Sequence, residues 1–231
     1  MKQQELKQPI RAIVTGATGM VGEGVLHECL LHPGVEQVLV IGRKPCGVTH
    51  PKLRELVLPD LYDLSPAAAE LTGYNACYFC LGVSSVGMNE ADYTRVTHDL
   101  TLHAAELLAR LNPDMVFCYV TGSGTDSTEQ GRSMWARVKG RTENELLRLP
   151  FRRAYMFRPG YIHPTPGLKN VHPYYRALKW LYPILRTVLP SGVITLRELG
   201  QAMVHAADGT YEPSILPCKE IRKLARLGEL S

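Results

Sequence analysis

Short, uniformly apolar runs alternate along the chain with longer segments in which apolar residues recur at helical spacing. Uniformly apolar runs are typical of strands that a parallel sheet buries on both faces. Right-handed crossovers between such strands predict an α/β fold with a doubly wound parallel sheet of six strands separated by helices. The predicted strands span residues 11–14, 37–41, 53–58, 77–81, 115–120 and 153–157, and the predicted helices span 25–31, 90–111 and 133–149.

The pattern changes after residue 160, where prolines become frequent. A Pro-interrupted helix is predicted over 175–188, a second helix over 196–207 and a short terminal helix over 219–227. Loops and additions beyond the carboxyl ends of parallel strands commonly carry function. We therefore expect one domain over residues 1–231, in which residues 161–231 form a small C-terminal helical extension on the substrate side.

A glycine-rich segment, Gly16-Ala17-Thr18-Gly19-Met20-Val21-Gly22, follows the first predicted strand and opens a helix. The first glycine allows a tight turn, the second lets the backbone approach a pyrophosphate, and the third lets the helix pack close to the strand. Free amides and the dipole at the helix N-terminus favour the anion. This context predicts a Rossmann NAD(P)-binding domain. The residues expected to hold the pyrophosphate are Gly16, Thr18, Gly19, Met20, Val21 and Gly22.

Two cations, Arg43 and Lys44, follow the second predicted strand. An NAD-preferring site usually has a carboxylate there to bind the ribose 2′-hydroxyl. Arg43 can instead form paired hydrogen bonds with a 2′-phosphate, and Lys44 adds a point charge. The sequence therefore predicts NADP (NADPH) as the cofactor, although a solvated pair of loop residues would look the same.

The loops after the third and fourth predicted strands supply further candidates for cofactor binding. Asp60 is expected to meet the edge of the adenine through its carboxylate, and Leu61 to pack on the ring. Leu81 and Gly82 are expected to run beside the pyrophosphate and ribose. Each of these residues also suits an ordinary loop.

Together these segments give the chain a resemblance to the atypical short-chain dehydrogenase/reductases. It is similar in particular to their NAD(P)-binding epimerase-like group, which includes the Tat-interacting oxidoreductase-like proteins. The resemblance covers roughly residues 11 to 210 and adds Pro159 and Gly160 to the expected cofactor-binding residues. Its marks are Thr-Gly-Ala-Thr-Gly at 15–19, Gly-Arg at 42–43, Asp60-Leu61, Leu81-Gly82, Lys139-Gly140 and Arg158-Pro159-Gly160.

The resemblance implies an NADP-dependent oxidoreductase that acts on a small carbonyl or alcohol. In that family a Tyr four residues before a Lys transfers the proton, the Lys lowers the Tyr pKa and holds the ribose, and a Ser polarises the carbonyl. Lys139 matches the Lys, but Trp135 stands at the Tyr position, and an indole cannot act as an acid near neutral pH. Ser123 has the expected spacing, with Thr121 as the alternative.

Three accounts of this departure stay open. Tyr161, after Arg-Pro-Gly, supplies the missing hydroxyl, so that Lys139, Ser123 and Tyr161 form the catalytic set. Water or the substrate supplies the proton instead, while Lys139 still orients the ribose. In the third account the protein is a redox-silent NADP-binding regulator or scaffold.

Composition narrows these functions. The chain has 231 residues and a formal net charge of +4, and its basic residues form no stripe, which argues against nucleic acid as a partner. Its eight histidines show no ligand spacing, so no metal is expected. Six dispersed cysteines suggest free thiols in a reducing, cytoplasmic setting, and neither a secretory signal nor a membrane span is evident.

The expected partner is a small-molecule substrate, while self-association is left open. The aromatic and basic segment 174–186 suits either a helix that covers the substrate cleft or weak contact with a membrane surface.

Overall fold

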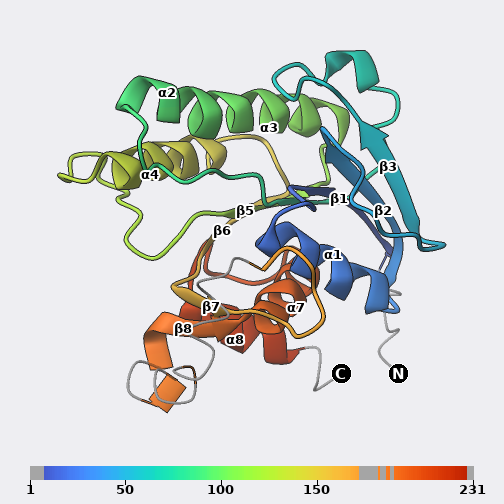
Figure 1. Ribbon diagram of the computed structural model, residues 1–231. Helices are drawn as coiled ribbons and strands as arrows, with labels where there is room; N and C mark the ends of the chain where they lie inside the picture. Colours follow the sequence, from blue (N-terminus) through green and yellow to red (C-terminus); the bar gives the residue numbers. More distant parts are fainter. Residues whose placement is uncertain (1–7, 172–181, 183–185, 188–189, 228–231) are drawn as a thin grey trace.

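A seven-stranded parallel sheet forms the centre of the computed structural model, which describes residues 8–171, 182, 186, 187 and 190–227. The strand order is β3-β2-β1-β4-β5-β6-β9, and every neighbouring pair is parallel (Figure 1). The order reverses between β1 and β4, which makes the loops after these strands neighbours. The strands are β1 (Ile10–Thr15), β2 (Val35–Gly42), β3 (Leu53–Val57), β4 (Ala76–Phe79), β5 (Val116–Val120), β6 (Arg153–Arg158) and β9 (Ile215–Pro217).

Successive residues of the inner strands point into two separate hydrophobic cores. In β1, for example, Ile13 belongs to one core and Val14 to the other, and in β4 the same holds for Cys77 and Tyr78. Each of these four side chains is fully buried. Burial on both faces explains why the strands appear in the sequence as uniformly apolar runs.

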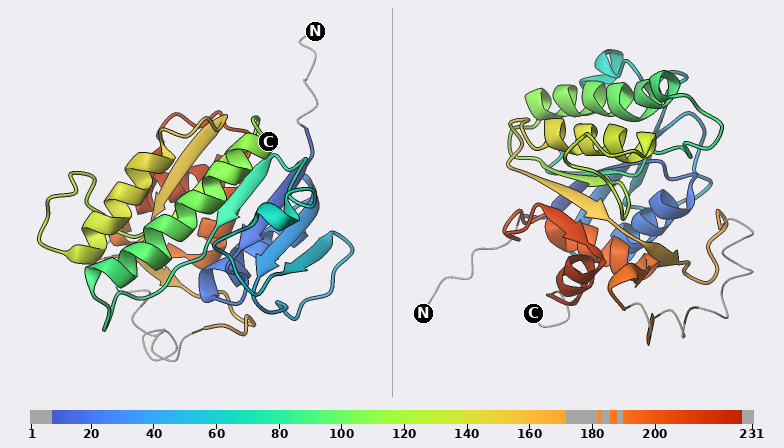
Figure 2. Two further views of the ribbon diagram at one scale, coloured as in Figure 1. Left: turned by 90° about the horizontal axis from the view of Figure 1, so that it is seen from above. Right: turned by 90° about the vertical axis from the view of Figure 1, so that its left-hand side faces the viewer.

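Helices cover both faces of the sheet. On one face lie α1 (Met20–Leu31), α7 (Leu196–Ala206) and α8 (Cys218–Leu227) (Figure 1). On the other face, α2 (Glu90–Thr94), a π-helical turn (Arg95–Asp99) and α3 (Leu100–Leu111) run on from one another. Figure 2 shows α3 beside α4 (Met134–Leu146) on this face. The doubly wound α/β fold predicted from the sequence is confirmed.

The expectation that helices separate all the predicted strands is wrong on one side of β1. Residues 43–52 join β2 to β3 as a loop, and the connection from β3 to β4 contains only a 3-10 turn at Ser65–Ala67. In the second of these connections turns replace a helix, because the carboxylates of Asp60 and Asp63 accept hydrogen bonds from the amides two residues ahead.

The C-terminal extension returns to the sheet and is not purely helical. Two three-residue strands, β7 (Tyr161–His163) and β8 (Val193–Thr195), pair in parallel, and β9 then adds to the main sheet beside β6. Helix α7 begins with a capping box in which Thr195 and Glu198 satisfy each other's backbone amides. The helix predicted over 175–188 lies mostly outside the described residues.

Candidate functional site

The glycine-rich turn joins the end of β1 to α1 through two close backbone approaches. Gly16 has a φ of +72°, and a Cβ there would lie 2.7 Å from the Cys80 carbonyl oxygen. A Cβ on Gly22 would lie 2.1 Å from the Gly16 carbonyl oxygen. Only glycine fits such contacts, so the turn has the geometry expected from its sequence.

The N-terminus of α1 has no side-chain cap. Gly19 occupies the N-cap position, and its own amide donates to the Gly16 carbonyl (2.9 Å). Met20 is buried in the core and Val21 is partly buried against it, so these residues offer main-chain amides to the site. A helix that begins with free amides and no capping side chain attracts an anion.

Thr15 fixes the turn against the neighbouring strand. Its buried Oγ1 accepts hydrogen bonds from the amides of Cys80 (3.1 Å) and Leu81 (3.3 Å), which follow β4. The two loops at the reversal of strand order are therefore joined by a side chain whose role the sequence analysis did not identify.

Glu23, in the first turn of α1, was also missed. Its carboxylate accepts hydrogen bonds from the amides of Lys169 (2.8 Å) and Asn170 (2.7 Å). The acid therefore ties the loop after β7 to the first turn of the helix. A first-turn acid is also a common sequence signal for a helix start, and only the fold shows this second use.

A cavity of about 480 Å³ extends from the glycine-rich turn to the ends of β2 and β4. Arg43 and Lys44 border it at the end of β2, while the buried Leu61 and the partly buried Leu81 border it from the adjoining loops. Tertiary structure thus brings together residues from four separate segments. The lining comprises Gly16, Ala17, Thr18, Val40, Ile41, Gly42, Arg43, Lys44, Leu61 and Leu81.

Some of the predicted cofactor residues lie beside this lining instead of in it. Asp60 is exposed, and its carboxylate accepts from the Tyr62 amide (2.9 Å). Gly82 is exposed in the loop after β4. Gly160 is explained by packing, because a Cβ there would lie 2.2 Å from the carbonyl oxygen of Gly192.

Lys139 lies on α4, facing the end of β5. Its Nζ donates to the carbonyl oxygen of Thr121 at 3.3 Å. Burial lowers the pKa of Lys139 to about 8, against the opposing effect of the Glu143 carboxylate. The amine is therefore poised between its charged and neutral forms near physiological pH.

The loop after β5 carries the predicted hydroxyl groups. Ser123 is exposed, and its amide donates to the Pro159 carbonyl (2.7 Å), which joins the loops after β5 and β6. The Trp135 ring packs over Gly124, where a Cβ would lie 3.4 Å from it. Tyr161 is partly buried in β7, two residues beyond Pro159.

The Thr121 hydroxyl has a different role from that of Ser123. It donates to the carboxylate of Glu143 (2.6 Å) and lies 3.2 Å from the Phe157 carbonyl oxygen. The Thr121 hydroxyl is therefore engaged inside the protein, whereas Ser123 is exposed.

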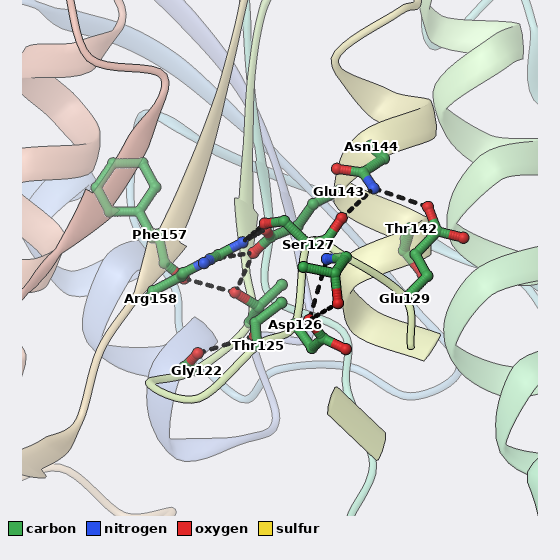
Figure 3. A network of polar contacts seen from close by, with 12 residues as sticks. Gly122, Thr125, Asp126, Ser127, Glu129, Thr142, Glu143, Asn144, Phe157 and Arg158 are labelled. Carbon is green, nitrogen blue, oxygen red and sulfur yellow. Dashed lines mark hydrogen bonds and ion pairs between the residues drawn. The ribbon is translucent and has the colours of Figure 1, made fainter. Parts of the chain in front are cut away.

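A buried ion pair lies beneath Lys139. The side chain of Glu143 is 0% exposed, and the guanidinium of Arg158 binds it through Nε at 3.0 and 3.1 Å and through Nη2 (Figure 3). Nη2 also donates to Ser127 Oγ (2.5 Å). In the sequence, Arg158 is marked only by its place in Arg-Pro-Gly, and no motif marks Glu143.

Two features are absent from the described residues. No helix among them is long and apolar enough to cross a membrane. Nor do three His, Cys, Asp or Glu side chains converge in this part of the chain to hold a metal ion. The proposed cleft or membrane helix over 174–186 lies outside the described residues except for Tyr182 and Arg186.

The chain is similar in sequence to two named proteins over most of its length. It is 24% identical over 226 residues to "Protein FMP52-1, mitochondrial" from Scheffersomyces stipitis, covering 95% of this chain and 97% of that protein. It is 26% identical to "Protein HTATIP2" from Rattus norvegicus, over 64% of this chain and 61% of the relative. These relatives confirm the resemblance predicted from the motifs.

A solved oxidoreductase of the short chain dehydrogenase/reductase family, from Burkholderia thailandensis, has the same fold. It superposes with a TM-score of 0.66 at 16% identity and covers 96% of this chain and 98% of its own.

The cytoplasmic location expected from the sequence is contradicted. The Scheffersomyces protein and Aspergillus and Emericella relatives are named as mitochondrial proteins. The expectation rested on free cysteines, which report on redox conditions and do not identify an organelle.

Residues 12–134 match the family described as "NAD dependent epimerase/dehydratase family", whose members bind a nicotinamide dinucleotide. This match begins in β1 and ends at the start of α4, so it spans the glycine-rich turn and the cavity. The chain belongs to the NAD dependent epimerase/dehydratase family.

Proposed function

We propose that this protein is an NADP(H)-dependent oxidoreductase that acts on a small carbonyl or alcohol. The observation that carries the proposal is the pair of cations, Arg43 and Lys44, on the cavity that begins at the uncapped end of α1. The bound cofactor would supply or accept a hydride, and the chain would supply binding, orientation and proton transfer.

The residues present fit a dinucleotide. Gly16 and Gly22 leave no room for a Cβ, which lets the turn, β4 and α1 pack closely and sets the start of α1 in the arrangement that suits a pyrophosphate. The amides of Met20 and Val21 and the hydroxyl of Thr18 would bind its oxygens, and Gly19 would let the backbone approach them. Leu61 would pack on the adenine, with Asp60 at the edge of the ring. The remainder of the cofactor would be bordered by Leu81, Gly82, Pro159 and Gly160.

The preference for NADP rests on charge. The residues that line the cavity, all within the described part of the chain, include no carboxylate, whereas Arg43 and Lys44 are exposed at the end of β2. A 2′-phosphate would gain paired hydrogen bonds from Arg43 and a second charge from Lys44. The 2′-hydroxyl of NAD would meet no acceptor of the usual kind there.

Replacement of one cation tests this preference. In Arg43→Ala, we expect NADPH affinity to fall by about 10- to 100-fold while NADH affinity changes little, because a charge-assisted contact contributes about 1.5–3 kcal/mol. Isothermal titration calorimetry with both nucleotides measures the difference. Arg54→Ala, which removes an exposed cation from the neighbouring strand β3, is the matched control. Equal losses for NADPH and NADH would remove the 2′-phosphate from the proposal.

Three side chains would act at the nicotinamide end of the cofactor, where the substrate reacts. Lys139 would hold the nicotinamide ribose through its ammonium, and Ser123 would donate a hydrogen bond to the substrate oxygen. Tyr161, on the strand that follows Pro159–Gly160, would exchange the proton with that oxygen. The hydrogen bond between the Ser123 amide and the Pro159 carbonyl supports this grouping. It joins the loop that carries Ser123 to the loop that leads into Tyr161.

Trp135 favours a second function, a redox-silent NADP-binding regulator or scaffold. Its ring packs over Gly124, next to Ser123, in the position where the family's proton-transferring Tyr is expected. Under this alternative, the protein would bind NADPH with no turnover over any panel of carbonyl substrates.

Restoring the phenol separates the two functions. If Tyr161 already transfers the proton, the wild type should oxidise NADPH over a carbonyl panel and Trp135→Tyr should change the rate little. If only the acid is missing, Trp135→Tyr should raise the rate by about 10²-fold, because proton transfer contributes about 10²–10⁴-fold. Trp135→Phe changes the ring without adding the acid and should give no gain. Tight NADPH binding with no turnover in the wild type and both variants would support the redox-silent alternative.

A further inference from the structure

Lys139 and Glu143 lie one helical turn apart on α4, and both contact the same residue. The carbonyl oxygen of Thr121 accepts from Lys139 Nζ (3.3 Å), while the Thr121 hydroxyl donates to Glu143 (2.6 Å). The Thr121 amide in turn donates to the Phe157 carbonyl (2.8 Å). Thr121 therefore fixes the distance from α4 to the ends of β5 and β6.

The carboxylate of Glu143 is in turn held by Arg158. Glu143 is 0% exposed and Arg158 is 17% exposed, so the ion pair lies in the interior (Figure 3). Burial of a charge is costly unless an opposite charge and hydrogen bonds compensate for it. Here Arg158 and Thr121 provide that compensation, which leaves the carboxylate little freedom to move.

Helix α4 itself is pressed against the loop after β5. A Cβ on Gly140 would lie 1.7 Å from the Asp126 carbonyl oxygen, and the Asp126 amide donates to the Ala136 carbonyl (3.0 Å). The backbone that carries Lys139 and Glu143 is therefore held at a fixed height above β5.

Each of the elements packed together here carries a charged group. Helix α4 contributes Glu143, strand β6 contributes Arg158, and the loop after β5 contributes Asp126. The Asp126 carboxylate accepts from the hydroxyl of Thr128 (2.6 Å) and the amide of Gly131 (2.7 Å). Glu143 raises the pKa of Lys139 and opposes the larger effect of burial.

We propose that Glu143, held by Arg158, is a positioning residue that fixes the ammonium of Lys139 over Thr121 and keeps it charged. The inference rests on the proposed role of Lys139 at the cofactor ribose and extends it to two residues that touch neither cofactor nor substrate. Glu143 acts through its charge and through Thr121, and Arg158 acts by holding Glu143.

A direct titration of Lys139 tests the proposal. The protein is labelled with ¹³C-lysine, the Cε resonance of Lys139 is assigned from its absence in Lys139→Met, and its titration is followed by NMR in ligand-free protein. In Glu143→Gln, which keeps the shape but removes the charge, we expect the midpoint to fall by about one pH unit. Glu143→Asp keeps the charge and should restore most of the wild-type value.

Glu145→Gln is the matched control, because it removes a carboxylate two residues away on α4 that binds Arg141 (3.0 Å) and His98 (3.1 Å). It should leave the Lys139 midpoint unchanged. If Glu143→Gln does not fold, the double variant Glu143→Gln/Arg158→Met removes both buried charges, and its midpoint should also be lower. An unchanged midpoint in whichever variant folds would overturn the proposal.

The titration does not depend on cofactor. Failure of the wild type to bind NADPH would count against the proposed function, while a lowered midpoint would still support the positioning role. When NADPH binds, the pH at which its affinity declines should move down together with the NMR midpoint, and a decline that stayed at the wild-type pH would separate Lys139 from the ribose.

Discussion

The two ends of the candidate site are built in different ways. At the β1–α1 turn, the groups available to a ligand are main-chain amides, and the glycines contribute by having no side chain. At the ends of β5 and β6, the available groups are side chains, and a buried ion pair supports them. The first end is set by backbone geometry, whereas the second depends on charge.

This difference predicts different sensitivities. A site made of main-chain amides loses affinity for its ligand when a side chain intrudes. Its affinity should not change with pH through the protein, because an amide does not titrate. A side-chain site tolerates changes of shape but responds to the loss of a charge and to the pKa of its lysine. Four experiments test whether the two ends respond in these different ways.

The largest effect is expected from Arg158→Leu. It leaves the fully buried carboxylate of Glu143 without its partner, so we expect the free energy of unfolding to fall by about 3–5 kcal/mol. Arg141→Leu breaks an exposed pair with Glu145 on the same helix and should cost at most about 1 kcal/mol. Urea denaturation measures both, and equal losses would mean that the buried pair has no special structural role.

Gly22→Ala should weaken cofactor binding at the other end of the site, the β1–α1 turn. The new Cβ would lie 2.1 Å from the Gly16 carbonyl oxygen, so the turn must shift and its amides lose alignment. We expect NADPH affinity to fall by about 100-fold, the scale of several lost charge-assisted hydrogen bonds. Gly192→Ala, where a Cβ would meet nothing within 4 Å, is the control. Calorimetry that gives both variants wild-type affinity would contradict a backbone site.

Thr15→Val tests the link between the loops after β1 and β4. It removes the acceptor for the amides of Cys80 and Leu81, and we expect unfolding to become easier by about 2 kcal/mol. Thr72→Val removes an exposed hydroxyl that bonds to the Ala68 carbonyl, and its effect should stay within about 0.5 kcal/mol. Thermal unfolding compares the two, and matching shifts would show that Thr15 contributes no more than a surface hydroxyl.

The smallest effect concerns pH. With a pKa of about 8, Lys139 is charged below that pH and neutral above it. NADPH affinity should therefore fall by about fivefold between pH 7 and 9, since a charge adds about 1 kcal/mol to a hydrogen bond. Lys44→Met should keep this decline and Lys139→Met should lose it. A decline that persists in Lys139→Met would assign the titration to another group.

Local patterns predicted much of the fold. The apolar runs located β1, β2, β3, β4, β5 and β6, and helical spacing located α1, α3 and α4. Most of these elements are buried, and the largely exposed edge strand β3 is the exception. The strands β7, β8 and β9 have three residues each and exist through pairing with distant segments, so no local period identifies them.

The candidate site divides in the same way. The glycine spacing and the two cations after β2 were evident in the sequence because each belongs to one continuous segment. Thr121, Glu143 and Arg158 come from three segments, and Glu143 has the appearance of an ordinary exposed residue on an amphipathic helix. Its burial follows from the packing of α4 on the loop after β5, which no local pattern records.

The strands of the doubly wound sheet, the glycine-rich turn and the positive charge at the end of β2 could be predicted from the sequence, because each depends on residues close together in the chain. Tertiary structure alone decided which polar groups are buried and paired. Coulomb interactions and desolvation act through space, so the charge on Lys139 depends on a helix, two strands and a loop that only folding brings together.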